Sequence, residues 1–173
     1  MIPFSLISIV GCQTGTNPSA TPNEEAQTYA EANKKILTDF GETIKRLGAR
    51  PIPTFAADAT KLQKRTVMAE ELDDLTHAAT DTLGKLYGLN PPPVMREVHR
   101  ATRDFVVTYR AGNMVYVDAI RRGKRAEVKA ARAKTEKDTA AAFVRLRAAL
   151  QAALIREGKT PEEADAMTAN VAL

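Results

Sequence analysis

The sequence predicts an all-α protein: an antiparallel bundle of long helices with an extended, coiled-coil-like C-terminal helix, which we expect to form oligomers. Apolar residues recur three and four positions apart over most of the chain, as they do along the buried face of a helix. Aromatic residues make up only 5% of the 173 residues and tryptophan is absent, so alanine supplies much of the apolar fraction. This composition is typical of long helices and coiled coils.

The charge distribution and the single cysteine limit the kinds of site that the protein can contain. The formal net charge is only +4, but residues 94–137 carry +7 while residues 51–93 carry −2. The single cysteine, Cys12, allows no internal disulfide framework and no cysteine-based zinc site. No apolar run reaches the roughly 18 residues that a membrane-spanning helix needs.

The chain divides into four parts. Residues 1–21 are an apolar N-terminal segment followed by a flexible linker rich in Thr, Ser, Asn, Gly and Pro. We expect a three-helix bundle over 22–120, a helical extension over 121–157 that is first basic and then rich in Ala and Leu, and a short C-terminal helix over 158–173.

The first helix begins at a capping box, Thr21-Pro22-Asn23-Glu24, which places proline at the first helical position. Gly48 is expected to end this helix, and the prolines of segment 50–53 indicate an extended connector. A narrow apolar seam suits it to packing on another helix; the seam consists of Ala26, Ala30, Asn33, Leu37, Phe40, Ile44 and Leu47.

A second helix can begin at Thr54 or Asp58 and runs to about Tyr87. Gly88 is expected to be its left-handed C-cap, and Asn90 to cap the next helix. This short turn predicts an antiparallel helical hairpin. The apolar seam of the second helix consists of Leu62, Thr66, Ala69, Leu72, Thr76, Ala79, Leu83 and Leu86.

The stretch from 94 to 157 would be roughly 64 residues and on the order of 96 Å long as a single helix. Gly123 could instead end a helix, and the chain would then fold back to complete a four-helix bundle. In that case Lys124 and Arg125 would lie at a helix N-terminus, where the macrodipole repels cations, and no Ser, Thr, Asp or Asn is present to cap it. We therefore favour a continuous or merely bent helix.

A second capping box, Thr160-Pro161-Glu162-Glu163, predicts the start of the C-terminal helix. Its apolar positions are Ala164, Met167 and Val171.

Side chains that could carry chemistry are few. The segment from Asp74 to His77 resembles half of a carboxylate–histidine metal motif, but the other histidine, His99, has Arg96 three positions before it. With only two histidines and one cysteine, the chain offers few residues that could form a nucleophilic catalytic triad. We predict a protein that is not an enzyme and that has no catalytic residue, metal site or cofactor.

A basic segment is the clearest candidate for binding. Residues 121–137 hold eight cations and two acids, and no aromatic residue lies between Tyr116 and Phe143. Contact with nucleic-acid phosphates or anionic lipid would therefore be non-specific and sensitive to salt; the alternative is an ordinary solvated helix face. The candidate residues for an anionic polymer are Arg121, Arg122, Lys124, Arg125, Lys129, Arg132 and Lys134.

The predicted extension also carries an apolar edge formed by Phe143, Leu146, Leu150 and Leu154. An isolated helix that exposes such an edge requires a partner, so we predict self-association through these four residues.

The N-terminus suggests a second interpretation. Ile9-Val10-Gly11-Cys12 resembles the sequence that precedes the lipidated cysteine of bacterial lipoproteins, although no Lys or Arg precedes Lys34. The resemblance implies lipidation at Cys12 and an outer-membrane lipoprotein whose helices act as a periplasmic adaptor. The alternative is an apolar tail that docks or inserts locally.

The layout of the whole chain, an apolar N-terminus followed by long helices rich in Ala, Lys and Arg, resembles the small internal core (ejection) proteins of short-tailed bacteriophages. That resemblance implies copies that form a ring in the virion interior and later reach the host envelope, where residues 1–12 could contact membrane. We therefore expect a structural protein whose partners are itself and other assembly proteins. A helical protein that binds nucleic acid weakly and non-specifically is the third interpretation.

Overall fold

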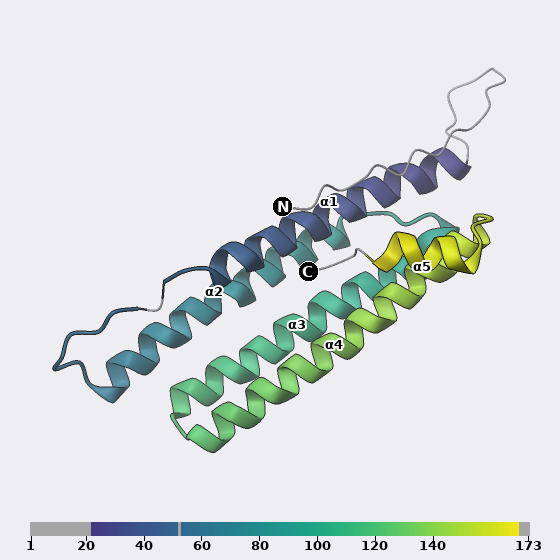
Figure 1. The fold of residues 1–173 in the computed structure, drawn as a ribbon. Coiled ribbons are helices and arrows are strands. Elements are labelled where there is room, and N and C mark those ends of the chain that lie inside the picture. Colours follow the sequence, from purple (N-terminus) through teal and green to yellow (C-terminus); the bar gives the residue numbers. More distant parts are fainter. Residues whose placement is uncertain (1–21, 52, 170–173) are drawn as a thin grey trace.

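The computed structural model of the chain describes residues 22–51 and 53–169, which form a bundle of long helices (Figure 1). The elements in order are α1 (Pro22–Gly48), α2 (Lys61–Tyr87), the 3-10 turn η1 (Pro93–Met95), α3 (Arg96–Arg122), α4 (Arg125–Arg156) and α5 (Pro161–Ala169). The described residues contain no strand, which confirms the all-α prediction. Thr21, the first residue of the predicted N-terminal capping box, lies outside the described residues, but α1 begins at Pro22 as expected.

Helices α3 and α4 form a hairpin, and the prediction of a continuous helix from 94 to 157 is wrong. Gly123 ends α3 in the left-handed conformation, with φ of 73°, and its N–H donates to the Ala119 carbonyl. The expected repulsion at the start of α4 is offset by Glu127, which pairs with Lys124 at 3.0 Å and with Arg122 at 3.5 Å. A carboxylate in the first turn thus compensates for the missing cap.

The hairpin is closely packed along its length. Phe105 of α3 meets Phe143 of α4 edge-on, with ring centroids 6.0 Å apart. Further along, Thr135 Oγ1 donates to the Gly112 carbonyl at 3.0 Å, and a Cβ atom at position 112 would stand 2.5 Å from Thr135 Cγ2. The absence of a side chain at Gly112 therefore lets the two backbones approach. The expected helical extension does not exist, because α4 folds back along α3 (Figure 1).

The structure corrects three predictions about the ends of helices. Helix α2 begins at Lys61 rather than after Thr54 or Asp58, because Thr60 forms a capping box with Gln63: Gln63 N donates to Thr60 Oγ1 at 3.2 Å. Gly88 is right-handed, with φ of −76°, rather than a left-handed cap. Asn90 does not cap α3, because the prolines at 91–93 delay the helix and η1 precedes it.

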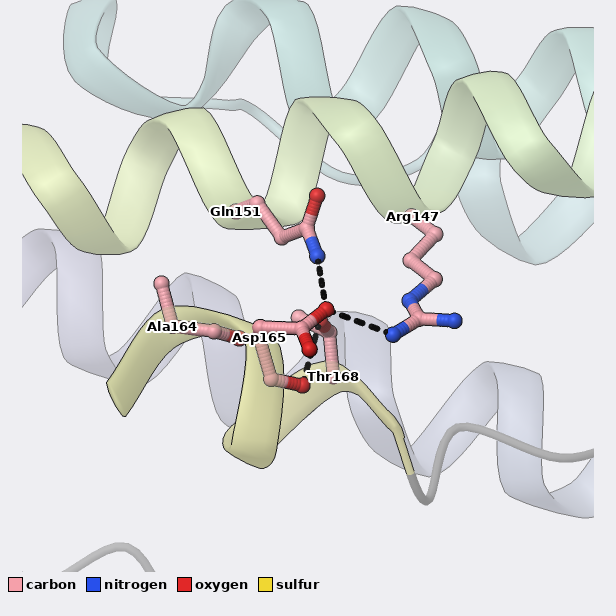
Figure 2. Close-up of polar contacts among 5 residues, drawn as sticks. All are labelled: Arg147, Gln151, Ala164, Asp165 and Thr168. Atoms are coloured by element: carbon pink, nitrogen blue, oxygen red, sulfur yellow. Dashed lines mark hydrogen bonds and ion pairs between the residues drawn. The ribbon is translucent and has the colours of Figure 1, made fainter. Parts of the chain in front are cut away.

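The predicted capping box at Thr160 is confirmed, since Glu163 N donates to Thr160 Oγ1 at 3.2 Å and Thr160 N donates to Glu163 Oε2 at 2.9 Å. Helix α5, the yellow helix of Figure 1, then lies along α4. Its contact is anchored by Asp165, which accepts from Arg147 at 2.7 Å and from Gln151 at 2.9 Å (Figure 2).

The buried apolar residues fall into two kinds of core. One cluster takes large side chains from all four long helices, including Phe40 of α1, Leu86 of α2, Phe105 of α3 and Leu146 of α4. Nearer the α3–α4 turn, a smaller cluster of Ala69, Val117 and Ile120 is joined by Leu72, Tyr116 and Val128 and receives nothing from α1. The bundle is thus four-helical over one half and three-helical over the other.

Candidate interaction surfaces

The predicted basic residues gather around the α3–α4 turn, but several are already paired. Arg121 bonds Asp73 of α2, and Arg122 pairs with Asp118 at 2.9 Å as well as with Glu127. Along α4, Arg132 pairs with Glu136 at 2.8 Å and Lys134 pairs with Asp138. Among the described residues Arg125 and Lys129 form no ion pair.

These pairs are exposed, so each contributes little to stability. Two of them nevertheless shift a pKa, that of Glu127 and that of Arg132. The hydrogen bond from Lys124 is the main cause that lowers the pKa of Glu127, and the charges of Lys124 and Arg122 act in the same direction. The hydrogen bond to Glu136 likewise raises the pKa of Arg132. Both shifts favour the charged forms of Glu127 and Arg132.

The start of α2 adds cations that sequence reasoning missed. The Arg65 guanidinium lies against Gly123, so closely that a Cβ atom there would collide with Arg65 Nη1. Residues more than fifty positions apart thus meet at one end of the bundle. We call this surface the basic end; it consists of Lys61, Lys64, Arg65, Arg121, Arg122, Lys124, Arg125 and Lys129. Residue spacing alone could not show that α2 begins beside this turn.

The residues predicted for self-association lie mostly within the chain's own core. Leu146 is buried in the four-helix cluster, and Phe143 packs against Phe105. Leu150 contacts two core clusters, while Leu154 is half-buried. The premise of an exposed edge is therefore wrong, because the fold-back of α4 supplies these side chains with partners from the same chain.

A different apolar surface is left open. A groove of about 610 Å³ runs between α3 and α4, and its walls include Tyr109, Tyr116, Ala140 and Phe143. No residue of α1 lines it, although Phe40 of α1 touches Tyr109 at one end, with ring centroids 5.4 Å apart. One end of the groove thus lies beside α1, while all of its lining residues belong to α3 and α4.

The opposite side of α3 carries an apolar ridge formed by Val107, Met114 and Val115. Their exposed fractions are 43%, 48% and 52%, and Ala111 between them is also exposed. Two residues further along a helix the side chain has turned by about 200°, so the ridge residues Val107 and Met114 point almost directly away from Tyr109 and Tyr116. One helix therefore presents a ridge on one side and a groove wall on the other.

Polar groups inside the four-helix half hold α1 in register. The Tyr29 hydroxyl lies 2.9 Å from His99 Nδ1, and Asn33 Nδ2 lies 3.4 Å from Thr102 Oγ1. Burial raises the pKa of Tyr29 to about 12, so the phenol stays protonated and shares a hydrogen bond with His99 whose direction depends on the tautomer of the ring. Burial, and secondarily the charge of Arg103, lowers the pKa of His99. This pair is suited to packing rather than to exchange with a ligand.

The suggested half-motif at Asp74 and His77 lies on α2, beside a second, more polar groove of about 390 Å³ between α1 and α2. Asp74 is occupied by an ion pair with Arg50. Within the described residues, no three His, Cys, Asp or Glu side chains are grouped so that they could hold a metal ion. Cys12, the predicted lipidation site, lies outside the described residues.

No helix in the described part of the chain is long and apolar enough to cross a membrane. The chain matches no protein-family model, and no curated protein or solved structure is similar to it. The surfaces described above are therefore the observations from which a function can be inferred.

Proposed function

We propose that this is a non-enzymatic helical structural protein that works as repeated copies within a larger assembly. The observation that carries the proposal is the open apolar groove beside Tyr109, Tyr116 and Phe143. These three aromatic side chains are only half-buried by the chain itself, and apolar area left open beside such side chains is typical of surfaces that bind another protein.

A second copy of the chain is the occupant we propose for the groove. The ridge of Val107, Met114 and Val115 supplies exposed apolar side chains of a suitable kind, and it lies on the far side of the same helix. Ridge and groove are different surfaces, so each copy would offer one to the preceding copy and one to the next. Contacts of this type produce rings when the rotation closes and filaments when it does not.

The layout of the chain favours one setting for such an assembly. Its resemblance to the internal core proteins of short-tailed phages points to a ring in the virion interior, with residues 1–12 available for later contact with the host envelope. Other proteins of the assembly would be further partners. A ring of identical helical subunits is the closed form of the ridge-and-groove contact.

Substitutions at neighbouring alanines of α4 test the proposal. Ala140 lines the groove and is exposed, so Ala140→Arg should block the groove without disturbing the core; Ala141→Arg, one residue away and outside the groove, is the matched control. Light scattering should give the wild type and Ala141→Arg a multiple of 18.8 kDa and Ala140→Arg a smaller mass. A wild type that stays monomeric at high micromolar concentration contradicts the proposal.

A mixing experiment tests the use of two different surfaces. Met114→Lys should spoil the ridge but leave the groove intact, whereas Ala140→Arg does the reverse. A mixture of the two variants should therefore form dimers and nothing larger, because each pair has only one complementary contact. If the mixture stays monomeric although the wild type assembles, the ridge does not occupy the groove.

An outer-membrane lipoprotein with a periplasmic helical bundle is the second candidate, and it is favoured by the pattern that ends at Cys12. The first described helix begins at Pro22, so a tether of nine residues, 13–21, would join a lipidated Cys12 to the bundle. The intact mass of the protein from its natural source separates the candidates. A species that begins at an acylated Cys12 supports the lipoprotein, and an unmodified chain that begins at Met1 excludes it.

A further inference from the structure

The basic end brings together cations from the start of α2 and from the α3–α4 turn. The contact between Arg65 and Gly123 fixes their proximity, and the exposed cations around it belong to the starts of α2 and α4 and to the last turn of α3. We propose that the basic end binds the phosphates of duplex nucleic acid without reading its sequence. This inference rests on the proposed function and deepens it by naming a partner of the assembly that is not a protein.

Part of the charge at the basic end lies at helix N-termini, where cations are unfavourable, and Glu127 offsets this repulsion only at the start of α4. The first turn of α2 holds no acidic residue but holds Lys61 and Lys64. The N-cap of α4 is Lys124, which provides no side-chain cap, and Arg125 follows it. Cations near the positive end of a helix dipole reduce stability. A polyanion placed there would relieve this repulsion, so the arrangement is suited to a ligand that carries many negative charges.

The ion pairs at this end do not prevent such binding. Asp73, Asp118 and Glu127 hold Arg121, Arg122 and Lys124 through exposed contacts. Exposed pairs of this kind contribute little stability, and an arginine fork can instead bind a phosphate with two parallel hydrogen bonds. Lys61, Arg125 and Lys129, which form no ion pair among the described residues, are available from the start.

The make-up of this surface favours nucleic acid over a bilayer. A surface that enters a lipid interface combines cations with a sizeable apolar face. At the basic end Leu62 is 64% exposed, but Phe55 is half-buried and has the Lys64 ammonium 5.8 Å from its ring centroid. One exposed leucine adds little apolar area, whereas eight cations can bridge several phosphates of a duplex.

Fluorescence anisotropy of the full chain with a labelled 25-base-pair duplex of arbitrary sequence tests the proposal. If three or four phosphates are neutralised, the logarithm of the binding constant should fall with the logarithm of salt concentration with a slope of about −3 to −4. The variant Lys61→Gln/Arg125→Gln/Lys129→Gln should weaken binding at least ~10-fold at 50 mM salt and reduce the slope by about 2 to 3.

The matched control removes the same charge from the other end of the bundle. In Lys85→Gln/Arg96→Gln/Arg100→Gln all three changed positions are exposed and lie at the end of α2 and the start of α3, away from the α3–α4 turn, so affinity should stay within ~3-fold of the wild type. An equal loss in both triple variants would show that only net charge matters and would overturn the proposal. A wild type that does not bind the duplex would also overturn the proposal. If that protein binds phosphatidylglycerol vesicles instead, the basic end is a lipid-binding surface. The assembly mass is measured separately, so either result leaves the proposed function to its own test.

Discussion

The half of the bundle that contains α1 and the half that lacks it share the same three long helices, yet they are packed differently. The four-helix half buries Phe40, Phe105, Leu86 and Leu146 together, with exposed fractions of 2% or less. The three-helix half buries mainly small and branched residues and is bordered by an open groove and a cluster of cations. The comparison indicates that stability is concentrated in one half and surfaces available to partners in the other.

The largest expected effect is a cavity in the four-helix half. Phe105→Ala removes a fully buried ring that meets Phe40 and Phe143, so it should lower the free energy of unfolding by about 3–5 kcal/mol. Ile120→Ala, its counterpart in the three-helix half, should lower it by about 2 kcal/mol because the open side allows the cavity to collapse. Urea denaturation measures both. Equal losses would show that the two halves contribute alike.

A smaller effect is expected at the turn that closes the three-helix half. Gly123→Ala combines a strained positive φ with displacement of the Arg65 side chain, and should lower the free energy of unfolding by about 2–3 kcal/mol. The control is Gly158→Ala, at the other end of the bundle, where φ is 91° but nothing lies near the added Cβ; only the backbone strain of about 1 kcal/mol applies. If thermal unfolding shows the same loss for both, contact with Arg65 is unimportant.

The smallest effect concerns pH and the attachment of α1. The pKa of His99 in the folded protein lies below its unfolded value of 6.5, so folding favours the neutral ring. Stability should therefore be fully present above about pH 6.5 and should decrease as the pH falls below it. Tyr29→Phe should lower the free energy of unfolding by about 1 kcal/mol at pH 7.5 by leaving Nδ1 without its hydrogen-bond partner. Urea denaturation at pH 7.5 and 5.5 measures both effects.

Substituting the histidines separates this effect from general acid destabilisation. His99→Gln should lose most of the difference between pH 7.5 and 5.5, whereas His77→Gln, at an exposed position of α2, should keep it. A His99→Gln protein with an unchanged pH profile would mean that the buried pair does not control the attachment of α1.

Helix content could be predicted from the sequence because apolar spacing and capping boxes are local properties. Thr160 and Glu163 form the predicted box, and α1 begins at the predicted proline. The turn at Gly123 was predicted wrongly because Lys124 and Arg125 were expected to destabilise a helix N-terminus at this point. Glu127, which pairs with Lys124 and Arg122, and the close approach of Gly112 to Thr135 both favour the fold-back.

The candidate surfaces were less predictable than the helices. Phe143 and Leu146 have the spacing of an interface, and only the return of α4 along α3 shows that they belong to the chain's own core. The groove depends on where α1 ends relative to Tyr109, and the basic end depends on where Arg65 meets Gly123. Each is a matter of tertiary register between distant segments, which spacing within one helix does not encode.

The position of Pro22 gives the bundle a direction. Helix α1 begins beside the residues that start α3 and end α4, whereas Gly123 lies at the far end of the molecule (Figure 1). The 32 residues of α4 span that length, about 48 Å at the rise of an α-helix. Partners bound at the two ends of the bundle would therefore be separated by helices of fixed length, and the protein could set the spacing between two surfaces.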